Sequence, residues 1–404
     1  MLPERLSAYL RYFTRLAYQP ANRWDGFDLR APDARLTSLR SQIFFSGCAL
    51  AALARHPLAS TDERSLAVTA LADMADRLIQ RRVWAAWAAE TERQGLKPDP
   101  VDVGYGAYSG ELAMLFGLQL ALGGTGRYDE DPLVLRWSAD VRSCYTTSGL
   151  VEALQRQLQE SPEGALRCEG DHATASGMAA VVWALRLHDL ATASGYGALG
   201  AVWLKTLADR MAVRGPRLFN RNTLASSFHV SSRRAVGAGD SLEDAWGLAL
   251  TVPLDRELVA GLAERYWLGF PKLRERGEPL PLAFSYLLAV ELGDQQRATD
   301  LLAYAEERFD LQEDDEGGRR FTGPPAAPWL TALYAMGEAG GMARLLEAAL
   351  SPLPAAPFLQ SDYQLEGELP PPDAVESGYA PYGETPTLDG REIPSPLGGE
   401  GMEP

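Results

Sequence analysis

Four reactive side chains stand close together in one short segment, at Cys168, Glu169, Asp171 and His172. A thiol, two carboxyls and an imidazole can transfer protons, and a thiol can also attack carbon as a nucleophile. Titratable groups are mostly kept out of protein interiors, yet this segment runs straight into the apolar stretch 178–185, which has the pattern of a buried helix. The sequence therefore predicts a pocket rim at this segment.

A second candidate is Glu111, which enters the apolar segment 112–120 shortly after Tyr105 and Tyr108. A glutamate in the first turn of a helix often does no more than complement the helix dipole in solvent. If Glu111 faces a cavity instead, the loss of water around it would raise its pKa toward the range that suits proton transfer.

Water loss from an alcohol needs an acid near the departing oxygen and a base near the departing C–H proton, both in a dry pocket. Glu111 and His172 are the candidates for these two roles, with Asp171 or Glu169 tuning the imidazole. Cys168 is a candidate acid, base or transient nucleophile. Each also has a structural interpretation: Cys168 as a small buried hydrophobic residue and His172 as a residue that merely begins a helix.

Composition limits the partners of the protein. The chain has 404 residues, of which 46% are hydrophobic, and a formal net charge of -16, which argues against a nucleic-acid surface and favours a small neutral or cationic ligand. Tyr105, Tyr108 and Trp246 are aromatic residues that suit an apolar or cationic substrate. Asp25 lies in a candidate lid or rim turn.

The three cysteines have neither metal spacing nor an even number, so the sequence indicates no disulfide framework and no metal site. Charged residues interrupt the N-terminal apolar stretch, as in an amphipathic helix and unlike a signal peptide. No apolar run reaches the length of a membrane-spanning helix. We therefore expect a cytoplasmic protein that does not contact a membrane.

Apolar residues recur at intervals of three and four along most of the chain, which predicts an all-α protein. About a dozen helices joined by short loops favour a ring of helical hairpins or an α-solenoid. Residues 1–350 form the predicted helical domain, and the Pro/Gly-rich residues 351–404 a predicted extended or disordered tail. The predicted helices are 3–20, 34–55, 61–80, 107–122, 147–159, 173–191, 198–212, 241–250, 255–268, 282–292, 296–308, 327–337 and 340–350.

Several segments, in the same order along the chain, resemble the linalool dehydratase/isomerase family. They are RRVWAAW (81–87), Asp99-Pro100, GAYSGELAMLFGLQLALGGTGRY (106–128), RCEGDH (167–172), Arg186 with Asp189, DAWGLA (244–249) and ELGDQQ (291–296). The resemblance covers residues 10 to 350. It implies an (α/α)6 barrel that forms oligomers and uses no cofactor, with a site at the inner helix ends that a neighbouring subunit closes.

The resemblance also implies roles for single residues. Cys168 and Glu169 match the family's Cys-Glu pair, Asp171 an acidic position, and Tyr18 an N-terminal active-site tyrosine. Four family positions carry other residues here: a histidine is replaced by Glu111, a second cysteine by Gly177, an asparagine by His172, and an acidic residue by Tyr12.

Three classes of function follow. The first is a cofactor-independent lyase or isomerase, performing dehydration, double-bond isomerisation or cyclisation on a small hydrophobic allylic alcohol, terpenoid or related natural-product intermediate. The second is a glycan-active barrel enzyme that uses paired carboxylates such as Asp25, Glu111 and Glu243. The third is a non-catalytic relative. Fold analogy cannot choose among them, because function belongs to the site.

Overall fold

The computed structural model describes residues 1–353, except positions 21, 30–38, 214–221, 323–326 and 348. Most of the predicted tail therefore lies outside the described residues. The described part is mostly helical and belongs to one compact unit, Met1–Phe358. Its helices are α1 (Glu4–Ala17), α2 (Leu39–Arg55), α3 (Thr61–Ile79), α4 (Arg81–Arg93), α5 (Gly106–Ala121), α6 (Arg127–Glu130), α7 (Thr147–Glu160), α8 (Ala175–Thr192), α9 (Gly197–Thr206), α10 (Ser241–Thr251), α11 (Arg256–Arg276), α12 (Pro279–Leu292), α13 (Gln295–Arg308) and α14 (Ala327–Glu338).

Three small antiparallel sheets join these helices. The first pairs β1 with β2, the second has the order β3-β4-β5, and the third pairs β6 with β7. None was predicted, because strands of two to four residues are too short to show a period of two. The strands are β1 (Leu133–Arg136), β2 (Arg142–Tyr145), β3 (His172–Ala173), β4 (Ser227–His229), β5 (Arg234–Val236), β6 (Leu311–Glu313) and β7 (Arg319–Phe321).

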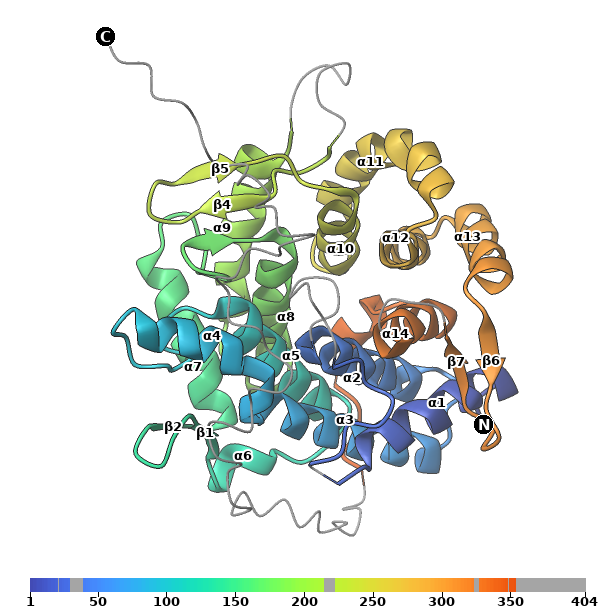
Figure 1. The fold of residues 1–404 in the computed structure, drawn as a ribbon, viewed down its shortest axis with the longest axis horizontal. Coiled ribbons are helices and arrows are strands. Elements are labelled where there is room, and N and C mark those ends of the chain that lie inside the picture. Colours follow the sequence, from blue (N-terminus) through green and yellow to red (C-terminus); the bar gives the residue numbers. More distant parts are fainter. Residues whose placement is uncertain (21, 30–38, 214–221, 323–326, 348, 354–404) are drawn as a thin grey trace, which may run out of the picture. The chain divides into compact units, whose positions relative to one another are not determined.

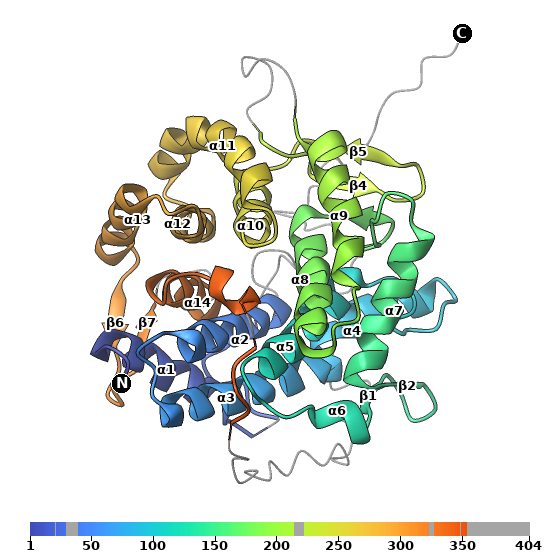
Figure 2. The same cartoon turned by 180° about the vertical axis from the view of Figure 1, so that it is seen from behind.

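Six helices contact one another in succession through the middle of this unit (Figures 1 and 2). In chain order, α2 contacts α5, α5 contacts α8, α8 contacts α10, α10 contacts α12, α12 contacts α14, and α14 contacts α2 again. Other helices pack against members of this set: α3 on α2 and α5, α9 on α8, α11 on α10 and α12, and α13 on α12. Helices that follow one another along the chain therefore pack together, as α2 with α3 and α12 with α13 do.

Glycines allow a close contact between α5 and α8. A Cβ at Gly110 would lie 2.7 Å from Cγ2 of Val181, and one at Gly117 would lie 2.7 Å from Cβ of Leu187. Distances below 3.0 Å are too short for real Cβ atoms, so only glycine lets the two helix backbones approach this closely. This contact fixes the start of α5, which carries Glu111, against α8.

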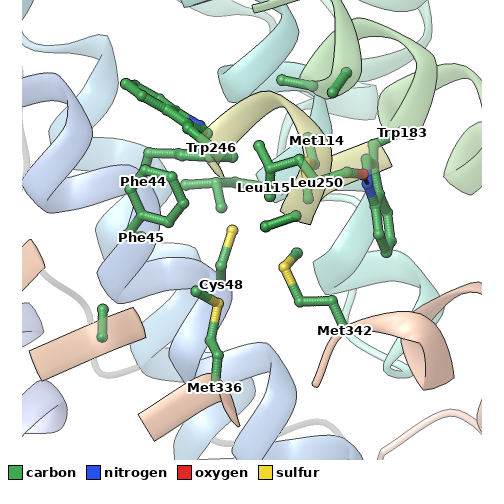
Figure 3. Close-up of a cluster of buried hydrophobic side chains, with 14 of the residues drawn as sticks. Phe44, Phe45, Cys48, Met114, Leu115, Trp183, Trp246, Leu250, Met336 and Met342 are labelled. Carbon is green, nitrogen blue, oxygen red and sulfur yellow. Dashed lines mark hydrogen bonds between the residues drawn. The ribbon is translucent and has the colours of Figure 1, made fainter. Parts of the chain in front are cut away.

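The interior of the helical unit is filled by side chains (Figure 3). Phe45 of α2 meets Trp246 of α10 edge to face there, and Cys48 of α2 lies beside the sulfur of Met336. The predicted buried run on α8 is confirmed, since Met178, Val181, Val182, Trp183 and Leu185 are all fully buried. The core is therefore packed, and a site must lie at the helix ends that surround it.

Two parts of the helix prediction were wrong. The predicted helix 340–350 is reduced to a single 3-10 turn, Ala343–Leu346, because Gly340 and Gly341 both adopt positive φ angles (+97° and +83°) that interrupt a helix. Helices α4 and α6 were not predicted at all. No helix in the described part of the chain has the length and apolar character that would let it cross a lipid bilayer.

The start of α3 gives a stability prediction. Ser60 accepts a hydrogen bond from the Glu63 backbone N–H (3.2 Å), and the Glu63 carboxylate accepts one from the Ser60 N–H (2.8 Å), which completes a capping box. We expect Ser60→Ala to lower the free energy of unfolding by about 1 kcal/mol in denaturant titrations. Thr61→Ala, one residue later and outside this box, is the matched control and should change it much less.

Candidate active site

A small cavity of about 20 Å³ lies among the N-terminal ends of the central helices. This volume holds one water molecule or one hydroxyl group. Glu111, Glu169 and Trp246, three of the predicted site residues, line it. The complete lining is Arg40, Ala107, Glu111, Glu169, Thr174, Ser176, Gly177, Glu243 and Trp246.

Helix caps and close backbone contacts bring these residues together. The Gly106 N–H at the start of α5 donates to the carbonyl of Arg167 (2.7 Å), which ties α5 to the segment that precedes β3. Thr174 caps α8 by accepting from the Gly177 N–H (3.1 Å), and Asp240 caps α10 by accepting from the Glu243 N–H (2.9 Å). The lining residues of α2, α5, α8 and α10 all lie within the first two turns of their helices as described.

Glu111 is held in this cavity by Arg40, a residue that the sequence analysis did not identify. Only 2% of Glu111 is exposed, and its Oε2 lies 3.1 Å from Nε of Arg40. The two atoms are not aligned for a hydrogen bond, and neither has a hydrogen-bond partner among the described residues. Arg40 also donates to the Tyr105 hydroxyl (2.8 Å) and lies 3.8 Å from Glu169.

The surroundings of Glu111 suit proton transfer. Burial raises the pKa of its carboxyl to about 7, since the charged form loses water; the Arg40 guanidinium opposes this rise and Glu169 adds to it. A carboxyl with a pKa near neutrality can both donate and accept a proton under physiological conditions. The alternative interpretation, in which Glu111 only complements the helix dipole in solvent, is wrong, because Glu111 is buried.

The two predicted aromatic residues of α5 and its N-cap do not line the cavity. Tyr105 stacks between Trp87 (ring centroids 5.0 Å apart) and Tyr108 (5.6 Å), with its hydroxyl bound to Arg40. Tyr108 is fully buried and donates its hydroxyl to the Leu78 carbonyl (2.8 Å). Tyr105 therefore orients Arg40, whereas Tyr108 is a packing residue.

Cys168 lies directly behind the cavity wall. A Cβ at Gly177, which lines the cavity, would be 2.9 Å from Sγ of Cys168. The thiol is fully buried, and burial raises its pKa to about 12, although hydrogen bonds with Thr174 oppose the rise. At neutral pH this cysteine is a protonated thiol, which is a poor nucleophile.

His172 and Asp171 face a different neighbourhood. In strand β3, Nδ1 of His172 lies 3.0 Å from the Ser227 hydroxyl, and its ring meets that of His229 edge to face, with centroids 5.0 Å apart. Asp171 accepts from Arg167 (3.0 Å) and lies 3.3 Å from Nδ1 of His229. Neither lines the cavity, and the expected pairing of Asp171 with His172 is replaced by the Asp171–His229 contact.

Tyr18 and Asp25 also lie away from the cavity. Tyr18 follows the last residue of α1, is 37% exposed, and borders a separate open groove of about 460 Å³ together with Arg11 and Leu66. Asp25 is exposed and pairs with Arg23 at 2.9 Å. The first turn beyond α1 thus directs both residues outward.

The structure adds Arg40 and Ser176 to the site, and it places Glu243, a candidate of the glycan hypothesis, in the same cavity. Ser176 donates to Glu243 at 3.3 Å across the cavity wall. A lone arginine at the start of the apolar α2 is a signal that could have identified Arg40, because a cation is rare in such a stretch without a partner. Among the described residues, no group of three or more histidine, cysteine, aspartate or glutamate side chains could hold a metal ion.

No model of a known protein family matches this sequence. The fold and the cavity define the class of the protein only broadly. It is a mostly helical protein with a buried, ion-paired glutamate at a small cavity among helix N-termini.

Proposed function

We propose that the chain is an (α/α)6 barrel protein related to the linalool dehydratase/isomerase family. The closed succession of contacts from α2 through α5, α8, α10, α12 and α14 back to α2 supports the barrel. The cavity among the helix N-termini, with Glu111 and Glu169 in its lining, supports a site at the position that the resemblance implies.

We further propose that the protein is a cofactor-independent lyase or isomerase that acts on a small hydrophobic allylic alcohol. The buried carboxyl of Glu111, with a pKa of about 7 and Arg40 beside it, is the observation that carries this proposal. A neutral Glu111 is a general acid at the cavity, where water is largely excluded.

In the proposed reaction, Glu111 transfers its proton to the hydroxyl oxygen of the substrate. The C–O bond breaks, its electron pair stays on oxygen, and the oxygen leaves as water. The electron pair of a neighbouring C–H bond forms the new double bond, and the carboxylate of Glu243 takes the proton. Arg40 stabilises the carboxylate that Glu111 becomes. The cavity matches the reacting hydroxyl in volume, so the carbon chain of the substrate must displace neighbouring side chains when it binds.

The test is an assay of the purified full-length protein on a panel of tertiary and primary allylic alcohols, with gas chromatography of the products. We expect dienes or transposed alcohols at pH 6 without added metal or nucleotide, and an unchanged rate in the presence of a chelator. Folded protein that turns over none of these alcohols, or that loses its activity with the chelator, would contradict the proposal.

Cys168 distinguishes acid–base catalysis from thiol catalysis. Because its thiol is protonated and lies behind Gly177, we expect Cys168→Ser to change kcat/KM by less than about tenfold, well below the effect of removing a positioned acid or base. Cys48→Ser, another buried thiol to hydroxyl exchange, controls for general effects on packing. A loss of about 10²-fold for Cys168→Ser alone would assign the chemistry to the thiol.

A second candidate function, glycan hydrolysis, is favoured by one observation: Glu111 and Glu243 line the same cavity, as two carboxyls of a glycosidase would. Asp25, the third carboxylate of that hypothesis, lies elsewhere and is exposed. Release of reducing sugar from an oligosaccharide panel, abolished by Glu243→Gln, would favour this function over the first.

A further inference from the structure

Trp246 lines the cavity and has a hydrogen-bond donor without a partner among the described residues. Its ring is 6% exposed and is fixed by stacking on Phe284 (centroids 5.4 Å apart) and by an edge contact with Phe45 (5.5 Å). The indole Nε1–H has no hydrogen-bond partner among the described residues. The indole of Trp183 is satisfied, since it donates to the Leu250 carbonyl at 2.8 Å. Buried donors in native proteins are nearly always paired, and the cavity that Trp246 lines offers room for the missing partner.

The polar groups around the cavity specify what kind of atom that partner is. An indole N–H can only donate, and the O–H of a neutral Glu111 is a second donor. The entering atom must therefore have two lone pairs, as oxygen does. An ammonium nitrogen has no lone pair to offer, which excludes a cationic amine at this position. The volume of about 20 Å³ limits the occupant to one hydroxyl group or one water molecule.

A hydroxyl oxygen also matches the acceptors. Oε2 of Glu111 has no hydrogen-bond partner among the described residues, and Glu243 lines the same cavity. A water molecule can accept from Trp246 and donate to carboxylates, which gives it the two to four polar partners that a buried water needs.

We propose that the cavity is an oxygen subsite, in which the Trp246 N–H binds the substrate hydroxyl and then holds the same oxygen as water after the C–O bond breaks. The part that concerns the reaction rests on the proposed function. Glu111 supplies the proton, the oxygen keeps the bonding electron pair, and the water formed stays between Trp246 and the Glu111 carboxylate. Its return to the other end of the allylic cation, with the proton given back to Glu111, transposes the alcohol without exchange of oxygen with solvent.

A crystal structure of the full-length protein at high resolution tests the subsite without any assay of activity. We expect an ordered oxygen within hydrogen-bond distance of Trp246 Nε1 and of Glu111. Trp246→Phe should lose this oxygen or displace it. Trp329→Phe is the matched control, because Trp329 belongs to the same aromatic cluster and its indole N–H also has no partner among the described residues, yet it does not line the cavity. A dry cavity in the wild-type structure would overturn the proposal.

Isotope labelling tests retention of the oxygen. An allylic alcohol labelled with ¹⁸O is converted in unlabelled water, and the transposed alcohol is analysed by mass spectrometry. We expect most of the label in the product of the wild type and of Trp329→Phe, and loss of label to solvent with Trp246→Phe. Complete exchange in the wild type would refute retention. If no alcohol is converted, the proposed function fails, whereas the crystallographic result still decides whether the oxygen subsite exists.

Discussion

Glu111→Gln is expected to lower kcat/KM for the allylic alcohol by about 10²-fold or more, the usual contribution of a positioned acid or base. Glutamine keeps the size of the side chain but cannot transfer a proton. The wild-type rate should also depend on pH in one direction. Since Glu111 acts as the acid and its pKa is raised to about 7, kcat/KM should be high below pH 7 and fall above it.

Glu291→Gln is the matched control for this variant. Glu291 is 4% exposed, its pKa is also raised to about 7 by burial, and it lies at the end of α12, outside the cavity lining. We expect its replacement to leave the pH profile of kcat/KM unchanged. Equal activity of Glu111→Gln and the wild type, with both proteins folded by circular dichroism, would rule out Glu111 as the acid.

Arg40→Met is expected to produce the largest change in stability. Arg40 is 8% exposed and is the cation nearest Glu111, and removing one partner of a buried ion pair leaves a buried charge, at a cost of about 3–5 kcal/mol. The pKa of Glu111 should rise further, because Arg40 lowers it in the wild type. The decrease in the free energy of unfolding should therefore be largest at pH 8.5, where Glu111 must be charged, and smallest at pH 5, where Glu111 is neutral.

The sign of this dependence follows from the raised pKa. Between the ordinary value of 4.5 and about 7, the folded protein keeps the Glu111 proton that the unfolded chain has lost. The contribution of Glu111 to the free energy of unfolding is thus fully present below pH 4.5. It is lost as the pH rises through 7, by about 3 kcal/mol in total. Urea titrations at the two pH values measure the change.

The double variant Arg40→Met with Glu111→Gln controls for packing. It has no charge at either position, so it should be more stable at pH 8.5 than Arg40→Met alone. Two results would contradict this prediction: equal destabilisation of Arg40→Met at pH 5 and pH 8.5, or a double variant that is no more stable than the single one. Either result would show that Arg40 does not stabilise the charged form of Glu111.

Local sequence determined most of the secondary structure. The capped helix predicted at 61–80 is α3, with Ser60 as its cap, because a cap and an apolar period act over neighbouring residues only. Leu66, which shares the apolar spacing of Leu71 and Met74 in this helix, is nevertheless 39% exposed, since the position of α1 and α5 on α3 decides which side chains are covered. The apolar period shows that the helix has a buried face, whereas tertiary packing decides which residues at the edges of that face are covered.

The sequence by itself also placed Glu111 and Glu169 near one site, because both stand next to segments that begin buried helices. It could not determine which neighbours they meet. Arg40 and Glu243 are far from them along the chain and reach the cavity only because α2 and α10 flank α5 and α8. Tertiary structure likewise decided that Gly177 screens Cys168 and that His172 faces Ser227. The direction and burial of a side chain depend on contacts between helices that are far apart in the sequence. The burial and the charged neighbours that result set the pKa of Glu111.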